Sequence, residues 1–202
     1  MKKYFENILK VIDESIRSMD ETAFNRLLED SVETLEQGKK IIVSGLGKNV
    51  PVCDKFVGTM ISLGQNASFM NTNSAIHGDF GMVHKDDLVI LLTKSGETQE
   101  TIQLAELLKK RDVRIWLLSF QKDSTLSKML ENNLLLHLQH EGDAWNVVPN
   151  NSTTINLLVL QGLAMNIAER RGVTLLEFKK NHPGGDIGNR LRSYSEDEME
   201  QP

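Results

Sequence analysis

Hydrophobic residues run without interruption through residues 88–92, LVILL, and then change their period. An unbroken apolar run of this length is typical of a strand buried on both faces of a parallel sheet. Beyond a short polar loop the apolar residues recur at helical spacing, with Ile102, Ala105 and Leu108 on one face. The stretch 88–109 therefore predicts a strand, a loop and a helix that packs back on the sheet.

The same alternation continues along the chain. Apolar strands are predicted at 39–44, 67–70, 88–92, 113–119 and 134–138, with helices between them. This order favours an α/β fold, a three-layer sandwich in which helices flank a five-stranded parallel sheet, flavodoxin-like or Rossmann-like. Ligands of such sheets bind beyond the carboxyl ends of the strands, so we expect the loops at 45–49 and 93–98 to meet there.

Two amphipathic helices, 5–16 and 22–36, precede the first strand, and they are predicted either to cover the sheet or to pair with another subunit. The chain of 202 residues is long enough for one well-buried domain and short for two. We therefore predict a single domain over 1–192, in which 1–38 form a helical pair, followed by an acidic disordered tail over 193–202.

Composition narrows the class of protein. The hydrophobic fraction of 40% and the charged fraction of 25% are ordinary for a soluble globular protein, and no apolar run is long enough to span a membrane. The net charge of -5 and the lack of a basic stripe disfavour nucleic-acid binding. Cys53, the single cysteine, excludes an internal disulfide. Glu6 and Asp13 interrupt any signal peptide, so a cytoplasmic protein is expected.

The polar loop TKSGET, after the central strand, is a candidate phosphate site. Thr93, Ser95 and Thr98 offer hydroxyls, and Gly96 offers a flexible backbone at a helix N-terminus. Ser95 could equally cap the helix while Gly96 turns the chain. A bound dianion would repel Glu97 unless its carboxylate pointed elsewhere, so Glu97 is expected to face the rest of the ligand.

Two further loops carry polar residues at helix starts. The turn GLGK at 45–48 lacks the third glycine and the longer spacing of nucleotide-binding loops, which argues against a dinucleotide site. Its Lys48 is either an exposed helix-start residue or a functional cation. Ser152 and Thr153 open a long apolar helix, 155–169, where they could cap the helix or bind an anion.

Two histidines lie in glycine-rich turns. His77 stands in IHGDFGM and His182 in HPGG. Locally, a histidine of this kind can be a buried hydrogen-bonded residue or a turn residue, and the alternative for both is catalysis.

The motifs together resemble one known family. G-L-G-K at 45–48, H-G-D-F-G-M at 77–82, S-G-E-T at 95–98, N-S-T-T at 151–154 and H-P-G-G at 182–185 are similar to the sugar isomerase (SIS) domain of arabinose 5-phosphate isomerases. The resemblance covers about residues 5 to 192. S-G-E-T alone indicates only a sugar-phosphate-binding domain, whereas H-G-D-x-G-M followed by H-P-G-G points to this narrower group. The expected form is a single domain without the CBS regulatory domains.

The resemblance implies an aldose-ketose isomerase that interconverts ribulose 5-phosphate and arabinose 5-phosphate, a precursor of the Kdo sugar of lipopolysaccharide. It implies a homotetramer whose active sites are shared between subunits, and no required cofactor, with an inhibitory zinc ion at His77 left open. One alternative is another sugar-phosphate isomerase, such as the hexulose 6-phosphate type, whose group lacks H-P-G-G. The other is a noncatalytic sugar-phosphate sensor.

The resemblance also implies site roles. Lys48, His77, Glu97 and His182 would surround the sugar, with Glu97 transferring the proton at carbon, either histidine moving oxygen protons, and Lys48 stabilising negative charge. The phosphate would be held by Ser44, Gly47, Asn49, Thr93, Ser95, Gly96, Thr98, Ser152 and Thr153. The chain departs from the pattern at Asn49, where the family usually reads G-K-S-G, and at 73–76, which is usually rich in Pro-Ala-Glu-Ala.

Overall fold

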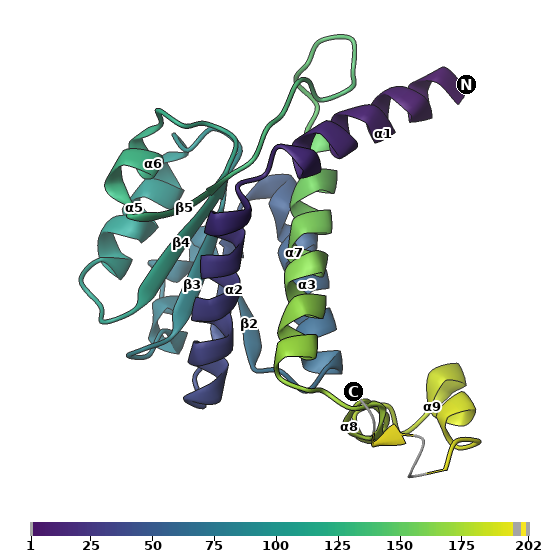
Figure 1. Cartoon of the computed structure of the whole chain (residues 1–202). Coiled ribbons are helices and arrows are strands. Elements are labelled where there is room, and N and C mark those ends of the chain that lie inside the picture. The colour runs from purple at the N-terminus through teal and green to yellow at the C-terminus, as the bar shows by residue number, and fades with distance from the viewer. Residues whose placement is uncertain (1, 196–198, 201–202) are drawn as a thin grey trace.

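The computed structural model describes residues 2–195 and 199–200, and in them five parallel strands form one sheet (Figure 1). The strands are β1 (Ile41–Gly45), β2 (Ala67–Asn71), β3 (Leu88–Leu92), β4 (Arg114–Ser119) and β5 (Asn132–Leu135). Their order is β2-β1-β3-β4-β5, which is the flavodoxin-like arrangement. The predicted five-stranded parallel sheet flanked by helices is confirmed.

The central strands are buried on both faces, as their unbroken apolar sequences predict. Every residue of β1 and β3 is buried, and the two strands pair with Val43 opposite Ile90. Val43 contributes to the core on one face, and its neighbour Ile42 contributes to the core on the other face. Adjacent strands of this kind bring their following loops to the same edge of the sheet.

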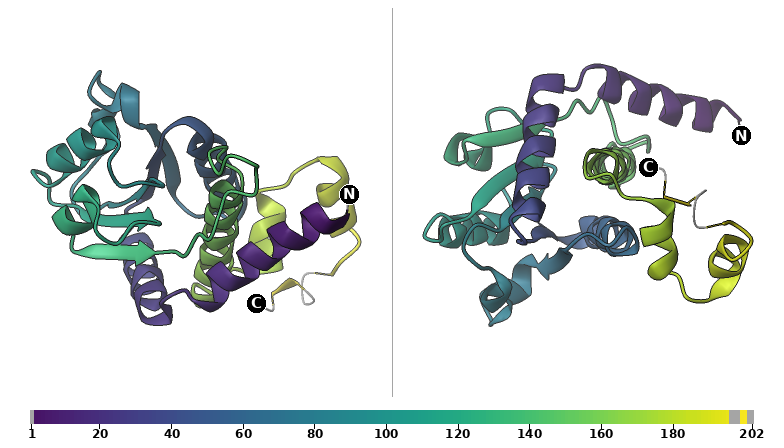
Figure 2. Two further views of the ribbon diagram at one scale, coloured as in Figure 1. Left: turned by 90° about the horizontal axis from the view of Figure 1, so that it is seen from above. Right: turned by 60° about the horizontal axis from the view of Figure 1, so that its bottom comes forward.

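Helices cover both faces of the sheet (Figure 2). The larger core lies under α2 (Glu21–Glu36), α3 (Val50–Ser62) and α7 (Asn151–Arg170), and the smaller one under α4 (Thr72–Ala75), α5 (Gln99–Leu108) and α6 (Thr125–Met129). Two short 3-10 helices, η1 (Gly47–Asn49) and η2 (Asp79–Met82), follow β1 and α4. Strand β5 begins before the predicted 134–138 because Asn132 already pairs with Trp116 of β4.

Both ends of the chain extend from the body of the fold (Figures 1 and 2). Helix α1 (Lys2–Arg17) packs through Val11, but its first turns expose Tyr4, Phe5 and Leu9. At the other end, α8 (Leu175–Lys180) and α9 (Gly185–Leu191) form an arm beyond α7. Of the N-terminal helices, α2 therefore covers the sheet, whereas α1 packs on α7.

The predicted acidic tail lies partly outside the described residues, so its disorder stays a prediction. Within the described part of the tail, Met199 is fully buried. Over residues 2–195 and 199–200, no helix is both long and apolar enough to cross a lipid bilayer.

An ion-pair cluster ties α2 to the start of β4 and predicts acid sensitivity. Arg114 Nη1 lies 2.6 Å from Glu33 Oε2 and 3.1 Å from Asp30 Oδ1. The hydrogen bond and charge of Arg114 hold the pKa of Glu33 below its ordinary value. A carboxyl whose pKa is lowered by folding stabilises the protein above its unfolded pKa, and this contribution is lost as the pH falls through the folded pKa.

Arg114→Met is therefore expected to lower the free energy of unfolding at pH 7. Below about pH 5, that free energy should decrease less with falling pH in the variant than in the unmodified protein. Urea unfolding between pH 7 and pH 3 measures both effects. Lys85→Met is the control, because Lys85 and Asp112 form an exposed pair at 3.9 Å. An acid slope identical to that of the unmodified protein would contradict the assignment.

Candidate functional site

Loops at the carboxyl edge of the sheet enclose a cavity of about 340 Å³. Its walls are η1, the loop between β3 and α5, and the first turns of α7. The predicted site residues that line it are Gly47, Lys48, Asn49, Thr93, Ser95, Thr98, Ser152 and Thr153. The predicted meeting of the two glycine loops is therefore found, because β1 and β3 are neighbours in the sheet.

In the loop before α5, hydroxyl oxygens accept hydrogen bonds within the loop, and their O–H groups remain as donors toward the cavity. Thr93 Oγ1 accepts a hydrogen bond from the Gly96 N–H at 3.2 Å, and Ser95 Oγ accepts one from the Glu97 N–H at 3.2 Å. Thr98 is the N-cap of α5, yet its side chain makes no capping hydrogen bond. Its hydroxyl and the first amides of a ten-residue helix can therefore bind an anion.

Gly96 shapes the loop rather than lining the cavity. Its φ of +68° lies in the left-handed region, and a Cβ there would overlap Ser124 Oγ and lie 2.5 Å from Ser124 Cβ. Ser124 in turn caps α6 by accepting a hydrogen bond from the Ser127 N–H. The close approach of two loops therefore requires glycine at this position.

Gly96→Ala is expected to lower the free energy of unfolding by about 3 kcal/mol, because strain at positive φ adds to the overlap with Ser124. Gly162→Ala is the matched control, since a Cβ at Gly162 meets nothing within 4 Å and its helical backbone suits alanine. Chemical denaturation of both variants measures the difference. Equal stabilities would show that Ser124 yields without cost.

A buried carboxylate that the sequence did not reveal lies beside the cavity. Glu141 has no exposed surface, and its Oε1 lies 2.7 Å from both Lys94 Nζ and Ser152 Oγ. Its Oε2 accepts hydrogen bonds from the backbone N–H groups of Ser152 and Asn150. Burial alone would raise the pKa of Glu141, but the bonds from Lys94, Ser152 and Asn150 outweigh it and lower the pKa. The carboxylate is therefore ionised at neutral pH.

Glu141 changes the predicted role of Ser152. Both the N–H and the hydroxyl of Ser152 donate to this carboxylate, so the N-terminus of α7 already holds an anion that belongs to the protein. Thr153 donates its hydroxyl to the Asn150 carbonyl at 2.9 Å, and its oxygen can still accept. The predicted phosphate contact of Ser152 is not available in this arrangement.

Lys94 is a second residue at the cavity that was not among the predicted site residues. It lies inside the TKSGET loop and lines the cavity, and its side chain is 40% exposed. Together with Lys48, it gives the cavity two cations. Because Lys94 lies within the predicted phosphate loop, the sequence could have identified it as a site residue. Nothing in the sequence around Glu141 marks that residue.

Glu97 does not line the cavity. Its carboxylate accepts hydrogen bonds from Thr125 N and Thr125 Oγ1, both at 2.7 Å, at the N-terminus of α6. These bonds, the backbone one first, lower the pKa of Glu97. Glu97 instead lines an adjoining hollow, which shares Lys94 and Ser95 with the cavity. Its expected place beside the rest of the ligand stays a prediction.

Two more predicted residues lie near the same edge but outside the cavity lining. Ser44 is buried in β1, and its Oγ lies 2.9 Å from Thr72 Oγ1. His77 is exposed in the turn after α4. In the part of the chain that the structure describes, no three His, Cys, Asp or Glu side chains gather to hold a metal ion.

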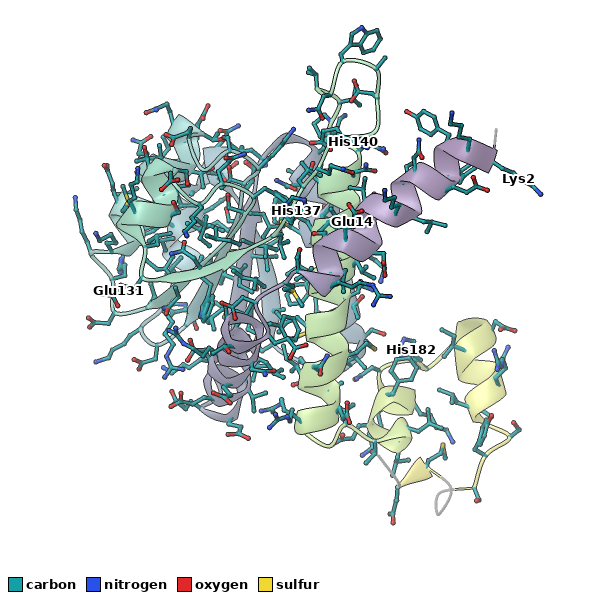
Figure 3. All side chains as sticks on the ribbon, turned by 45° about the horizontal axis from the view of Figure 1, so that its top comes forward. Lys2, Glu14, Glu131, His137, His140 and His182 are labelled. Carbon is teal, nitrogen blue, oxygen red and sulfur yellow. The ribbon has the colours of Figure 1, made fainter. Side chains whose placement is uncertain are left out.

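His182 lies at the far end of α3 from the cavity. Its Nε2 is 2.9 Å from Ser62 Oγ, its Nδ1 is 2.8 Å from the Phe178 carbonyl oxygen, and its ring stacks on Phe178. Ser62 ends α3, whereas Lys48 comes just before it, which separates them by roughly 20 Å. Figure 3 shows His182 beside α8, away from the loop that carries His140. A single chain does not bring His182 to the cavity.

The arrangement suits an anionic ligand that gives up a proton to a base. Lys48, Lys94 and the N-terminus of α5 provide positive charge for a dianion. Glu141 provides an ionised carboxylate that can accept a proton once its partners release it. Cation, donor and base are thus gathered around one cavity.

Known proteins match this chain over most of its length. The model of the SIS domain matches residues 34–165. The arabinose 5-phosphate isomerase KdsD of Pseudomonas aeruginosa is 37% identical over 83% of this chain and 52% of that protein. An arabinose 5-phosphate isomerase KpsF of Escherichia coli is 36% identical over 79% of this chain and 50% of that protein. The chain spans about half the length of these curated relatives.

A solved structure agrees in fold. An Escherichia coli CFT073 protein in complex with arabinose 5-phosphate has a TM-score of 0.83 and 30% identity, over 90% of this chain and 95% of that chain. The family model covers more than half of the chain, and the relative from Pseudomonas aeruginosa exceeds 30% identity over most of it. The chain therefore belongs to the SIS (sugar isomerase) domain family.

Proposed function

We propose that the protein is a sugar-phosphate aldose-ketose isomerase that interconverts ribulose 5-phosphate and arabinose 5-phosphate through a cis-enediol. The observation that carries this proposal is the cavity in which two lysines and a free helix N-terminus lie next to the ionised, buried Glu141. The relatives named arabinose 5-phosphate isomerase and the neighbour bound to arabinose 5-phosphate support the choice of substrate.

The phosphate would bind at the loop before α5. Thr98, Ser95 and the first amides of α5 donate hydrogen bonds there, and Lys94 adds charge. A phosphate that attracts Lys94 would draw it from Glu141, at present 2.7 Å away. The carboxylate would then lose an ion-pair partner, its pKa would rise, and it would become a stronger base.

The chemistry moves protons within the substrate. A base removes a proton from C1 of ribulose 5-phosphate, and the C2 carbonyl oxygen takes a proton, which gives the cis-enediol. A proton then returns to C2 while the O1 hydroxyl loses its proton, which gives the aldehyde of arabinose 5-phosphate. Lys48 would stabilise the charge that develops on O2.

The cavity changes which carboxylate is favoured as the base. Glu141 borders the cavity through its contacts with Ser152 and Lys94, whereas Glu97 is bonded to Thr125 and faces α6. We therefore assign proton transfer at carbon to Glu141 and keep Glu97 as the alternative. His77 or His182 would move the oxygen protons. The reaction needs no redox cofactor, and zinc at His77 would act only as an inhibitor.

His182 would serve the cavity of a neighbouring subunit in a homotetramer. Its distance from Lys48 along α3 and its place on the arm of α8 and α9 support this assignment. The apolar side chains that α1 exposes, Tyr4, Phe5 and Leu9, support assembly into an oligomer.

Mixing two inactive variants tests the shared site. Lys48→Gln and His182→Ala are each expected to lose turnover as separate preparations. After co-refolding, mixed oligomers are expected to regain part of the activity, because some sites receive an intact Lys48 and an intact His182. The readout is product formation, with each variant refolded alone as the control. No recovery in oligomers shown to be mixed would contradict a site shared in this way.

Turnover identifies the substrate. We expect the protein to convert ribulose 5-phosphate to arabinose 5-phosphate, followed by NMR, and to leave hexulose 6-phosphate largely unchanged. Glu97→Gln separates the two candidate bases, because it should retain activity if Glu141 is the base. If the protein converted only hexulose 6-phosphate, the proposed substrate would be wrong and the hexulose 6-phosphate alternative would be correct. Tight binding of sugar phosphates without any turnover would identify a sensor.

A further inference from the structure

Two asparagine side chains form a pair in the lining of the cavity. Asn49, at the end of η1, accepts a hydrogen bond at its Oδ1 from Asn156 Nδ2 of α7, at 3.1 Å. The pair requires glycine at position 45, because a Cβ at Gly45 would lie 2.9 Å from Asn49 Cβ and displace that side chain. The pair therefore joins the wall that carries Lys48 to the wall that carries Ser152.

The pair is left with one acceptor and one donor group. Asn156 is 1% exposed, and its Oδ1 has no hydrogen-bond partner among the described residues. In the same part of the chain, Asn49 Nδ2 makes no hydrogen bond. Exchanging the oxygen and nitrogen positions of both amides would leave one donor and one acceptor again. A buried amide atom without a partner is unfavourable, so a ligand atom that satisfies it gains binding energy.

This combination fits a hydroxyl group. A hydroxyl donates one hydrogen bond and accepts others, so one sugar hydroxyl can donate to Asn156 Oδ1 and accept from Asn49 Nδ2. A phosphate dianion offers only acceptor oxygens, and the carbonyl oxygen of Asn156 would repel it. The phosphate donors, Ser95 and Thr98, lie on the loop before α5 instead.

From these contacts we infer that Asn49 and Asn156 determine sugar specificity by binding one hydroxyl of the phosphorylated sugar. This inference rests on the proposed function, because it assumes that a sugar phosphate occupies the cavity. It assigns a sugar contact to both side chains, in place of the phosphate contact that the family resemblance implied for Asn49. A purely structural pair would hold η1 against α7 and would not distinguish between sugars.

Equilibrium binding to the full chain tests the inference. The probes are inorganic phosphate, arabinose 5-phosphate and its monodeoxy analogues. We compare two variants, Asn156→Ala and Asn49→Ser, with the control Asn166→Ala. Asn49→Ser introduces the serine that the family usually carries in G-K-S-G. Asn166 is the matched control, because it lies on the same helix and donates to the Gly162 carbonyl, and the cavity lining does not include it.

We expect the unmodified protein to bind one monodeoxy analogue about tenfold more weakly than arabinose 5-phosphate. Asn156→Ala should bind arabinose 5-phosphate about tenfold more weakly, with no further loss for that analogue, which is the non-additivity of groups in contact. Asn49→Ser should show the same loss of preference even if Asn156→Ala folds poorly. Affinity for inorganic phosphate should not change in any variant.

An unchanged preference among the sugars in Asn156→Ala and Asn49→Ser would overturn the inference, even if the protein isomerises its substrate. Sugar phosphates that bind no more tightly than inorganic phosphate would also overturn it. The expected binding pattern without turnover would support the inference and reject the isomerase. Absence of binding by every phosphate would reject both.

Discussion

Glu141→Gln is expected to reduce isomerase turnover about 100-fold and the free energy of unfolding by about 3 kcal/mol. Each carboxylate oxygen of Glu141 receives two donors, from Lys94, Ser152 and Asn150. A glutamine amide would replace one acceptor with a donor and leave Lys94 without its counter-ion. The loss of a base and the loss of a buried anion therefore coincide in one substitution.

Glu106→Gln is the matched control, because Glu106 is exposed on α5 and makes no ion pair with another described residue. Thermal unfolding gives the change in stability, and initial rates with ribulose 5-phosphate give the change in turnover. Normal turnover in folded Glu141→Gln would exclude Glu141 as the base and return that role to Glu97. Normal stability would show that the cluster of Lys94 and Ser152 tolerates a neutral partner.

Lys48→Gln is expected to lower kcat/KM about 100-fold while leaving the stability unchanged. Lys48 is exposed, lines the cavity, and has no ion-pair partner in the part of the chain described, so folding does not depend on its charge. Its charge is needed only when negative charge develops on the substrate. The effect should therefore fall mainly on kcat.

Lys55→Gln serves as the control for Lys48→Gln, since Lys55 is exposed on α3 and its Nζ contacts Thr59. Steady-state kinetics separate kcat from KM, and binding of inorganic phosphate reports on the phosphate site. A rise in KM with kcat unchanged would place Lys48 at the phosphate rather than at the reacting carbons. If Lys48→Gln had the same kcat and KM as the unmodified protein, Lys48 would have no role in catalysis or substrate binding.

The fold and the place of the cavity could be predicted because they depend on local patterns. Unbroken apolar runs such as Leu88–Leu92 indicate buried parallel strands, and the alternation of strand and helix limits the topology. The carboxyl ends of β1 and β3 then bring Lys48 and Thr98 to one cavity. These inferences needed no knowledge of side-chain contacts.

The details of the site depend on contacts between segments far apart in the sequence, which local patterns do not contain. Glu141 lies in the irregular chain between β5 and α7, and only the path of that chain brings it to Lys94. Glu97 turns to α6 because Thr125 offers two donors there. The position of His182 likewise follows from its contacts with Ser62 and Phe178.

Isomerisation in deuterated water tests the cis-enediol chemistry at this cavity most directly. With ribulose 5-phosphate as the substrate, we predict arabinose 5-phosphate that carries solvent deuterium at C2, and loss of both product and label in Glu141→Gln and Lys48→Gln. If neither product nor exchange at C1 or C2 occurs with any pentose or hexose phosphate, although arabinose 5-phosphate binds, the protein is a noncatalytic sugar-phosphate-binding domain.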